Sequence, residues 1–246
     1  MFSIFKKKYE GATDLSGIKT DMHSHILPGI DDGAQDEEQS LQLIKGLQEL
    51  GYDKFIATPH VLSDMFPNDR ETITGALSKL SGVLGQNNQR VDLSAAAEYY
   101  LDDHFSALLE SNAPLLTLTD KYVLVEFPFV SAPYNYKEQL FQLQLCGYQP
   151  VLAHPERYSY FYYQKEVFDD LKSAGCLFQS NLLSLIGYYG KQAQDLALYL
   201  KKKGYINLLG TDLHHLRHLE ALRTSKQLQP IVNSFLDSGQ LMNPEW

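Results

Sequence analysis

The sequence has few cysteines, no long apolar run and no excess of positive charge. Its 246 residues include only two cysteines, which cannot form a disulfide framework and indicate a reducing, cytoplasmic location. No run of about 18 apolar residues is present, so we predict no transmembrane segment. Acidic residues number 30 against 21 basic ones, and the resulting net charge of −9 argues against nucleic acid as a partner.

Short apolar runs alternate with longer amphipathic segments along the chain. We expect seven strands, in residues 18–25, 54–60, 91–99, 122–127, 150–154, 175–181 and 206–214. The intervening segments carry apolar residues at helical spacing and predict helices over residues 36–50, 70–84, 102–110, 136–146, 165–174, 191–203 and 216–228. This alternation is typical of parallel strands covered by helices, either in a β/α barrel or in an open doubly wound sheet.

Polar side chains end six of the seven expected strands. In a β/α barrel the C-terminal ends of the strands meet at one face, where catalytic groups lie. His23 and His25 are two residues apart, so on a strand both imidazoles project from the same face. Asp212 and His214 repeat this spacing. The full set of candidate ligands is His23, His25, Asp32, His60, Glu98, Glu126, His154, Asp212 and His214.

These candidates have the donor chemistry of a metal site. Glu126 lies inside an apolar strand, where an unpaired charge is costly, so it needs a cation or stays protonated. Histidine and carboxylate without thiolate suit Mn, Fe, Zn, Co or Mg ions. Five histidines and four carboxylates exceed what one ion binds, so the count predicts two or three ions. Taken singly, each residue is more often an ordinary core or surface side chain, and only their joint position argues for a site.

The ordered set resembles the PHP (polymerase and histidinol phosphatase) superfamily. Within it, the segments DMHSHILPGIDDG, AEYY, VEF, AHPER and TDLHH are similar to bacterial manganese-dependent tyrosine-protein phosphatases of capsule and exopolysaccharide loci. The resemblance implies a distorted (β/α)7 TIM-like barrel that holds two or three Mn²⁺ ions. We therefore expect a single PHP-type catalytic domain over residues 18–246, after a flexible N-terminal extension of residues 1–17.

The resemblance also implies which residues hold which ion. The expected ligands are His23, His25, Glu98 and Asp212 for a first ion, Glu98, Glu126 and His154 for a second, and Asp32, His60 and His214 for a third. Asp32 is preferred over Asp31 because the family ligand directly precedes the glycine of this turn.

Two arginines are expected beside the metal ligands. Arg157 matches a family arginine and is expected to bind phosphate through its planar fork of donors. Arg217 is the candidate for a second family arginine, although its spacing from Asp212 is shorter than the family pattern. The expected catalytic residues are thus Arg157, Asp212 and Arg217. His215 and His218 are expected at a solvated helix start, and no general acid is assigned.

The expected function is that of a hydrolase acting on phosphate monoesters. Three divalent ions with four carboxylates leave the site net positive, which suits a dianionic phosphate ester, and a metal-bound hydroxide is the expected nucleophile. As the resemblance implies, the substrate would be phosphotyrosine on a protein partner, namely a bacterial tyrosine kinase that controls polysaccharide synthesis or export. Two alternatives stay open: a small-molecule phosphoesterase such as a histidinol-phosphatase, and a non-catalytic metal-stabilised binding module.

Overall fold

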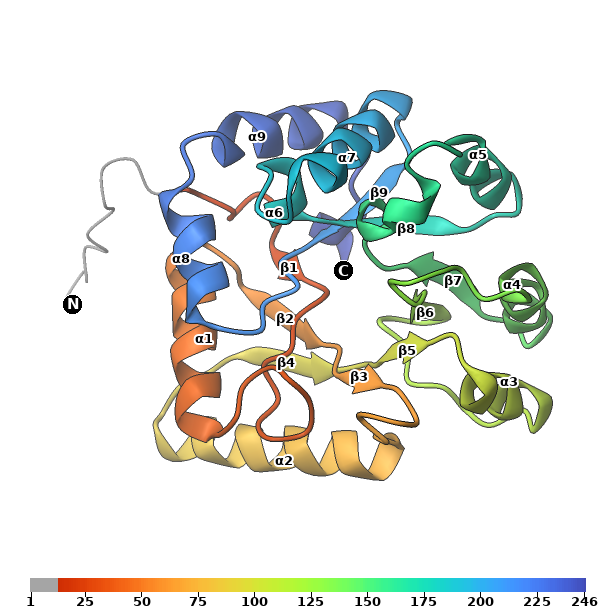
Figure 1. Cartoon of the computed structure of the whole chain (residues 1–246). Coiled ribbons are helices and arrows are strands. Elements are labelled where there is room, and N and C mark those ends of the chain that lie inside the picture. The colour runs from red at the N-terminus through yellow and green to blue at the C-terminus, as the bar shows by residue number, and fades with distance from the viewer. Residues whose placement is uncertain (1–12) are drawn as a thin grey trace.

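The computed structural model describes residues 13–246, in which strands and helices alternate along the chain (Figure 1). Most of the expected N-terminal extension, residues 1–12, lies outside the described residues. Its last part packs against the domain: Leu15 is fully buried, and the Thr13 hydroxyl donates to the Leu222 carbonyl over 2.7 Å. Ordered structure therefore begins before residue 18. No helix in residues 13–246 is long and apolar enough to cross a membrane.

The described residues form nine short strands that occupy the seven expected runs. All strand pairs are parallel. The second and third runs each contain two strands, because Thr58-Pro59 and Ala96-Ala97 interrupt the ladder and proline has no N–H to donate. The strands are β1 (Thr20–Asp21), β2 (Lys54–Ala57), β3 (His60–Val61), β4 (Asp92–Ala95), β5 (Glu98–Tyr100), β6 (Tyr122–Glu126), β7 (Gln149–Leu152), β8 (Leu177–Asn181) and β9 (Ile206–Gly210).

Helices follow the strands and lie outside them (Figure 1). Six of the seven expected helices are confirmed, but the last, expected over residues 216–228, ends at Thr224, and a separate helix begins at Leu228 because Ser225 has an extended backbone. The aspartates Asp36, Asp69 and Asp102 start three helices by accepting a hydrogen bond from the backbone of the first turn. The α-helices are α1 (Glu37–Glu49), α2 (Arg70–Gln86), α3 (Asp103–Glu110), α4 (Tyr136–Leu145), α5 (Glu166–Ser173), α6 (Leu182–Leu185), α7 (Lys191–Lys203), α8 (Leu216–Thr224) and α9 (Leu228–Ser238). Three 3-10 helices complete the described chain: η1 (Pro155–Arg157), η2 (Ser159–Phe161) and η3 (Asn243–Glu245).

The parallel α/β architecture is confirmed, whereas a closed seven-stranded barrel is not. Within residues 13–246 the strands form two separate sheets, with orders β1-β2-β4 and β3-β5-β6-β7-β8-β9. Between the first and last runs, the Asp212 N–H donates to the His23 carbonyl over 2.8 Å and the His25 N–H to the Leu213 carbonyl over 3.0 Å. Asp212 has a φ of 50°, in the left-handed region, so the backbone there is not extended and no regular ladder joins β1 to β9.

The strands separate two apolar clusters. Along β6, Val123 and Val125 belong to the large cluster that includes the buried faces of the helices, while Leu124 belongs to a small second cluster. The small cluster consists of Met22, Ile56, Ala96, Leu118, Leu124, Val151, Ala153 and Leu208. Because side chains alternate along a strand, Glu126 shares the face of Leu124 one step nearer the C-terminal end. The polar site therefore continues directly from this small cluster.

Candidate metal centre

The structure brings all nine candidate ligands together at the C-terminal ends of the strands. Their nitrogen and oxygen atoms form four overlapping groups, within each of which the atoms lie less than 4.8 Å apart. The groups are His23–His25–Asp212, His23–Glu98–His154, His60–Glu98–Glu126 and His25–Asp32–His60–His214. Side chains separated by nearly 200 residues in the sequence thus share one cluster.

The centre of the cluster consists of two imidazoles and two carboxylates. His23 Nε2 lies 3.3 Å from Glu98 Oε2 and 3.5 Å from Asp212 Oδ1. His25 Nε2 lies 3.5 Å from each of the same two oxygens. All four side chains are essentially inaccessible to water.

A second part of the cluster surrounds the other oxygen of Glu98. His154 Nε2 lies 3.1 Å from Glu98 Oε1 and 3.5 Å from Glu126 Oε1. His154 has a φ of 30°, so the chain turns sharply after β7 and carries the imidazole toward the two glutamates. Glu98 therefore presents one oxygen to each part, as a bridging ligand would.

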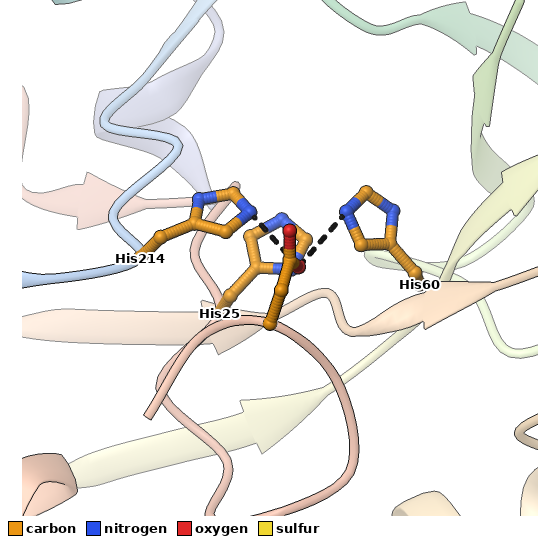
Figure 2. A group of neighbouring side chains, drawn as sticks. His25, His60 and His214 are labelled. Atoms are coloured by element: carbon orange, nitrogen blue, oxygen red, sulfur yellow. Dashed lines mark ion pairs between the residues drawn. The ribbon is translucent and has the colours of Figure 1, made fainter. Parts of the chain in front are cut away.

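The third part lies nearest the solvent, where His25, His60 and His214 surround a carboxylate group (Figure 2). Asp32 Oδ1 lies 3.5 Å from His60 Nε2 and 3.4 Å from His214 Nε2, and the rings of His25 and His214 stack with centroids 3.9 Å apart. His60 also places Nδ1 3.1 Å from Glu98 Oε2. Its two ring nitrogens therefore face different parts of the cluster.

The electrostatics of the cluster match a site for cations. Burial, together with the charges of Glu98 and Asp212, raises the pKa of Glu126 well above its usual value. Burial acts in the same direction on Glu98, but His23 and His60 outweigh it and hold the pKa of Glu98 well below its usual value. Glu98 Oε2 is buried and accepts no hydrogen bond from any described residue. A buried carboxylate oxygen that accepts no hydrogen bond and lies among imidazole nitrogens has the donor chemistry of a divalent-ion site, so the residues fit such ions.

Three polar residues behind the ligands were not expected from the sequence. Asp31 is 9 % exposed and its carboxylate lies 2.8 Å from His25 Nδ1, whereas the side chain of Asp32 is 56 % exposed and faces the cluster. Gln179 and Asn181 are fully buried on β8, which occupies the one expected run without a candidate ligand at its end. For these two residues, polar side chains in a run predicted to be a buried strand were the signal that could have identified them.

A hollow of about 260 Å³ opens onto the cluster. Arg157 Nη1 lies 3.1 Å from Asp212 Oδ2, and its guanidinium lies between the rings of Phe129 and Tyr189, 4.5 and 4.4 Å from their centroids. Arg157 thus lies beside the candidate ligands. The lining residues are Asp32, His60, Glu126, Phe129, His154, Arg157, Tyr189, Asp212, His214, His215 and His218.

Two residues at the start of α8, Arg217 and His218, differ from expectation. Arg217 is exposed and lines a neighbouring hollow instead of the one above the cluster. His215 caps the start of α8, as expected, but the expectation of a solvated His218 is wrong: it is 8 % exposed. The rings of His215 and His218 lie 3.9 Å apart, and burial lowers the pKa of His218 to about 4.

Comparison with known proteins identifies the family. Residues 19–226 match the family described as capsular polysaccharide synthesis, CpsB/CapC. The tyrosine-protein phosphatase YwqE of Bacillus subtilis is 34 % identical over 80 % of this chain and 78 % of its own, and the tyrosine-protein phosphatase CpsB of Streptococcus agalactiae is 28 % identical over 80 % and 83 %.

A solved structure supports the same relationship. It comes from crystal structures of YwqE from Bacillus subtilis and CpsB from Streptococcus pneumoniae, described as metal-dependent tyrosine phosphatases. It superposes with a TM-score of 0.78 at 28 % identity and covers 92 % of this chain and 90 % of that chain. The resemblance read from the sequence motifs is confirmed, and the chain belongs to the CpsB/CapC family of capsular polysaccharide synthesis proteins.

Proposed function

We propose that this protein is a metal-dependent phosphatase that hydrolyses phosphotyrosine on a protein partner. The observation that carries the proposal is the convergence of nine histidine and carboxylate side chains beside the guanidinium of Arg157. The curated relatives are tyrosine-protein phosphatases, which supports the same activity here. We further propose a cytoplasmic location, supported by two cysteines that are both free thiols.

Three ions are the proposed occupants of the cluster, with Mn²⁺ as the proposed metal. His23, His25, Glu98 and Asp212 would hold the first, Glu98, Glu126 and His154 the second, and Asp32, His60 and His214 the third. The groups His23–His25–Asp212 and His25–Asp32–His60–His214 support the first and third assignments. The second is supported by His154 Nε2, which lies 3.1 Å from Glu98 Oε1 and 3.5 Å from Glu126 Oε1. Bound there, divalent ions lower the pKa of a coordinated water towards about 7 and so supply hydroxide at neutral pH.

Arg157 is the proposed phosphate-binding residue. Its guanidinium packs against the rings of Phe129 and Tyr189, and its N–H donors point outward within the plane of the group. One donor meets Asp212 Oδ2, and the remaining donors are available to phosphoryl oxygens in the hollow. Because the two rings restrict the guanidinium, little conformational entropy is lost when phosphate binds.

A neighbouring hollow supports a polypeptide substrate over a small one. It has a volume of about 500 Å³, lies between the starts of α1 and α8, and shares His215 with the hollow above the cluster. Asp36, Gln39, Gln42 and the half-exposed Leu216 line it. Amide and carboxylate groups beside an apolar contact suit the backbone and side chains flanking a phosphotyrosine. A tyrosine kinase of polysaccharide synthesis is the proposed source of this polypeptide.

Phosphate release from a phosphotyrosine peptide tests the proposal directly. We expect EDTA to abolish release and added Mn²⁺ to restore it, and hydrolysis that persists in EDTA would contradict the metal-dependent mechanism. The same enzyme should turn over histidinol phosphate much more slowly than the peptide.

A surface variant separates polypeptide from small-ester substrates. Leu216→Glu places a charge in the neighbouring hollow and should raise KM for the peptide while leaving p-nitrophenyl phosphate hydrolysis unchanged. Equal effects on both substrates would argue against a polypeptide track, and binding without hydrolysis would favour a non-catalytic module.

A further inference from the structure

Two buried amides connect three of the candidate ligands. Gln179 and Asn181 both lie on β8 with no exposed surface. Gln179 Oε1 lies 2.8 Å from His23 Nδ1 and 3.2 Å from the backbone nitrogen of His154. Gln179 Nε2 donates to Asn181 Oδ1 over 2.9 Å, and Asn181 Nδ2 donates to Asp212 Oδ2 over 2.6 Å. We call this sequence of bonds the amide chain.

The direction of every bond in the amide chain follows from one backbone group. The His154 N–H can only donate, so the atom of Gln179 that faces it must be the carbonyl oxygen. The NH₂ group of Gln179 must then face Asn181, which turns the oxygen of Asn181 toward Gln179. The NH₂ group of Asn181 is left to face the carboxylate of Asp212.

The same direction determines which nitrogen of His23 carries the proton. Because Gln179 Oε1 can only accept, His23 Nδ1 must be the N–H donor. The lone pair of the neutral ring is then on Nε2, which is the nitrogen that faces Glu98 and Asp212. A ligand imidazole that donates its other N–H in this way has a defined tautomer and ring orientation.

At the other end of the amide chain, the two carboxylate oxygens of Asp212 have different partners. Oδ2 accepts from Asn181 and from Arg157 Nη1, the latter over 3.1 Å. Oδ1 faces His23 and His25, 3.5 Å from the Nε2 atom of each. Only Oδ1 is therefore oriented toward a cation held between these imidazoles.

The close approach of Gln179 to β9 requires a glycine at position 210. A Cβ atom at Gly210 would lie 2.7 Å from Gln179 Nε2 and 2.7 Å from the Cβ atom of His23. Contacts this short do not occur for real side chains, so β9 has room for the amide only because residue 210 is glycine.

We propose that Gln179 and Asn181 are positioning residues that select the His23 tautomer and orient Asp212 for cation binding. This inference rests on the proposed function, because it assumes that the cluster binds divalent ions. It concerns cation affinity and which ring nitrogen of His23 carries the proton, so it can be tested without measuring phosphatase activity.

Variants at both positions test the proposal in the full chain. Gln179→Met keeps the length of the side chain but removes both polar atoms, and Asn181→Ala interrupts the amide chain one bond further on. We expect about 10- to 100-fold weaker Mn²⁺ binding in each variant, as is usual when a group that orients a ligand is lost. EPR of free Mn²⁺ measures this affinity. If Gln179→Met fails to fold, Asn181→Ala provides the same test.

A spectroscopic readout separates positioning from general damage. In the Zn²⁺-loaded protein, the His23 Nδ1–H should give an exchange-protected imidazole proton signal that disappears in Gln179→Met. Gln179→Glu should retain this signal, since a carboxylate oxygen still accepts from Nδ1–H. The matched control is Gln139→Met, because Gln139 is buried and donates to Asp102 and Ser106, which are not part of the amide chain.

Three outcomes would overturn the proposal. They are a retained His23 signal in Gln179→Met, Mn²⁺ affinity within about twofold of wild type in both β8 variants, or an equal loss in Gln139→Met. A wild-type protein whose Mn²⁺ affinity depends on the amide chain, but which leaves phosphotyrosine intact, would instead contradict the proposed function alone.

Discussion

On one face of the strands, a layer of apolar side chains (the apolar level) lies next to a layer of carboxylates and histidines (the polar level). Leu124 and Glu126 are two residues apart on β6, and both are buried. Ala96 and Glu98 show the same relation at the start of β5. The apolar level stabilises the fold because it removes apolar surface from water. The polar level instead concentrates carboxylates whose charge is costly to bury, so its residues are explained by what they bind.

Removing a carboxylate from the polar level should have the largest effect. Glu126→Gln keeps the size of the side chain but removes a proposed ligand. We expect phosphotyrosine hydrolysis to fall by at least about 100-fold, since losing groups merely behind ligands costs about 10- to 100-fold. In the metal-free protein the free energy of unfolding should not fall, because burying the carboxylate is itself unfavourable. A clear loss of metal-free stability would show that Glu126 is mainly structural.

The reciprocal change, in the apolar level, should lower stability and leave the metal site intact. Leu124→Ala removes a fully buried side chain, and such changes cost about 2–5 kcal/mol of unfolding free energy. Urea denaturation of the metal-free protein measures this loss. Mn²⁺ affinity below the unfolding transition should stay close to wild type, and a large decrease would show that the two levels are not independent.

A substitution in the turn next to the ligands should have a smaller effect on both stability and Mn²⁺ affinity. A Cβ atom at Gly33 would lie 2.1 Å from the His25 carbonyl oxygen, so Gly33→Ala must displace the backbone of a proposed ligand. We expect a loss of about 1–3 kcal/mol in stability together with weaker Mn²⁺ binding. Gly82→Ala is the control, because a Cβ atom at Gly82 would meet no other part of the protein within 4 Å and the residue lies in α2, where alanine favours the helix. Equal effects at both glycines would contradict the steric argument.

The smallest expected effect concerns Cys176, a thiol in the large apolar cluster whose reactivity is lowered by burial. Burial raises the pKa of the Cys176 thiol to about 12, whereas the neighbouring imidazoles keep Glu98 ionised. At pH 8 only about one Cys176 thiol in ten thousand is a thiolate, and the side chain is 1 % exposed. Iodoacetamide should therefore label the half-buried Cys146 alone, and mass spectrometry should detect a second label only after unfolding. Rapid labelling of both thiols in the folded chain would show that this part of the core opens.

Local patterns in the sequence predicted most elements and the identity of the candidate ligands. The alternation of apolar runs is a short-range property, so the strands and helices could be located without knowing their partners. Breaks within runs were harder to predict: the expected single strand over residues 54–60 is two strands, β2 and β3. Their separation depends on which neighbour each residue pairs with, and the sequence pattern does not contain that information.

Residues that act through contacts distant in sequence were missed or misplaced. Gln179 carries no charge, and its importance appears only once His23 lies beside it, 156 positions away. His218 was expected at a solvated helix start, but its ring packs against Tyr188 and His215. Arg217 matched a family position approximately, yet the direction in which α8 leaves the cluster places it in a neighbouring hollow.

The amino-acid sequence by itself determined the kind of chemistry, because residue types and their order establish which donor atoms the chain offers. Histidines and carboxylates at strand ends indicated cations and phosphate before any geometry was known. Only the tertiary structure decided how those atoms are presented: which oxygen of Asp212 faces the cluster, which nitrogen of His23 has the proton, and which arginine lines the hollow. These properties depend on hydrogen bonds and packing between segments far apart in the chain, which form only when the strands come together.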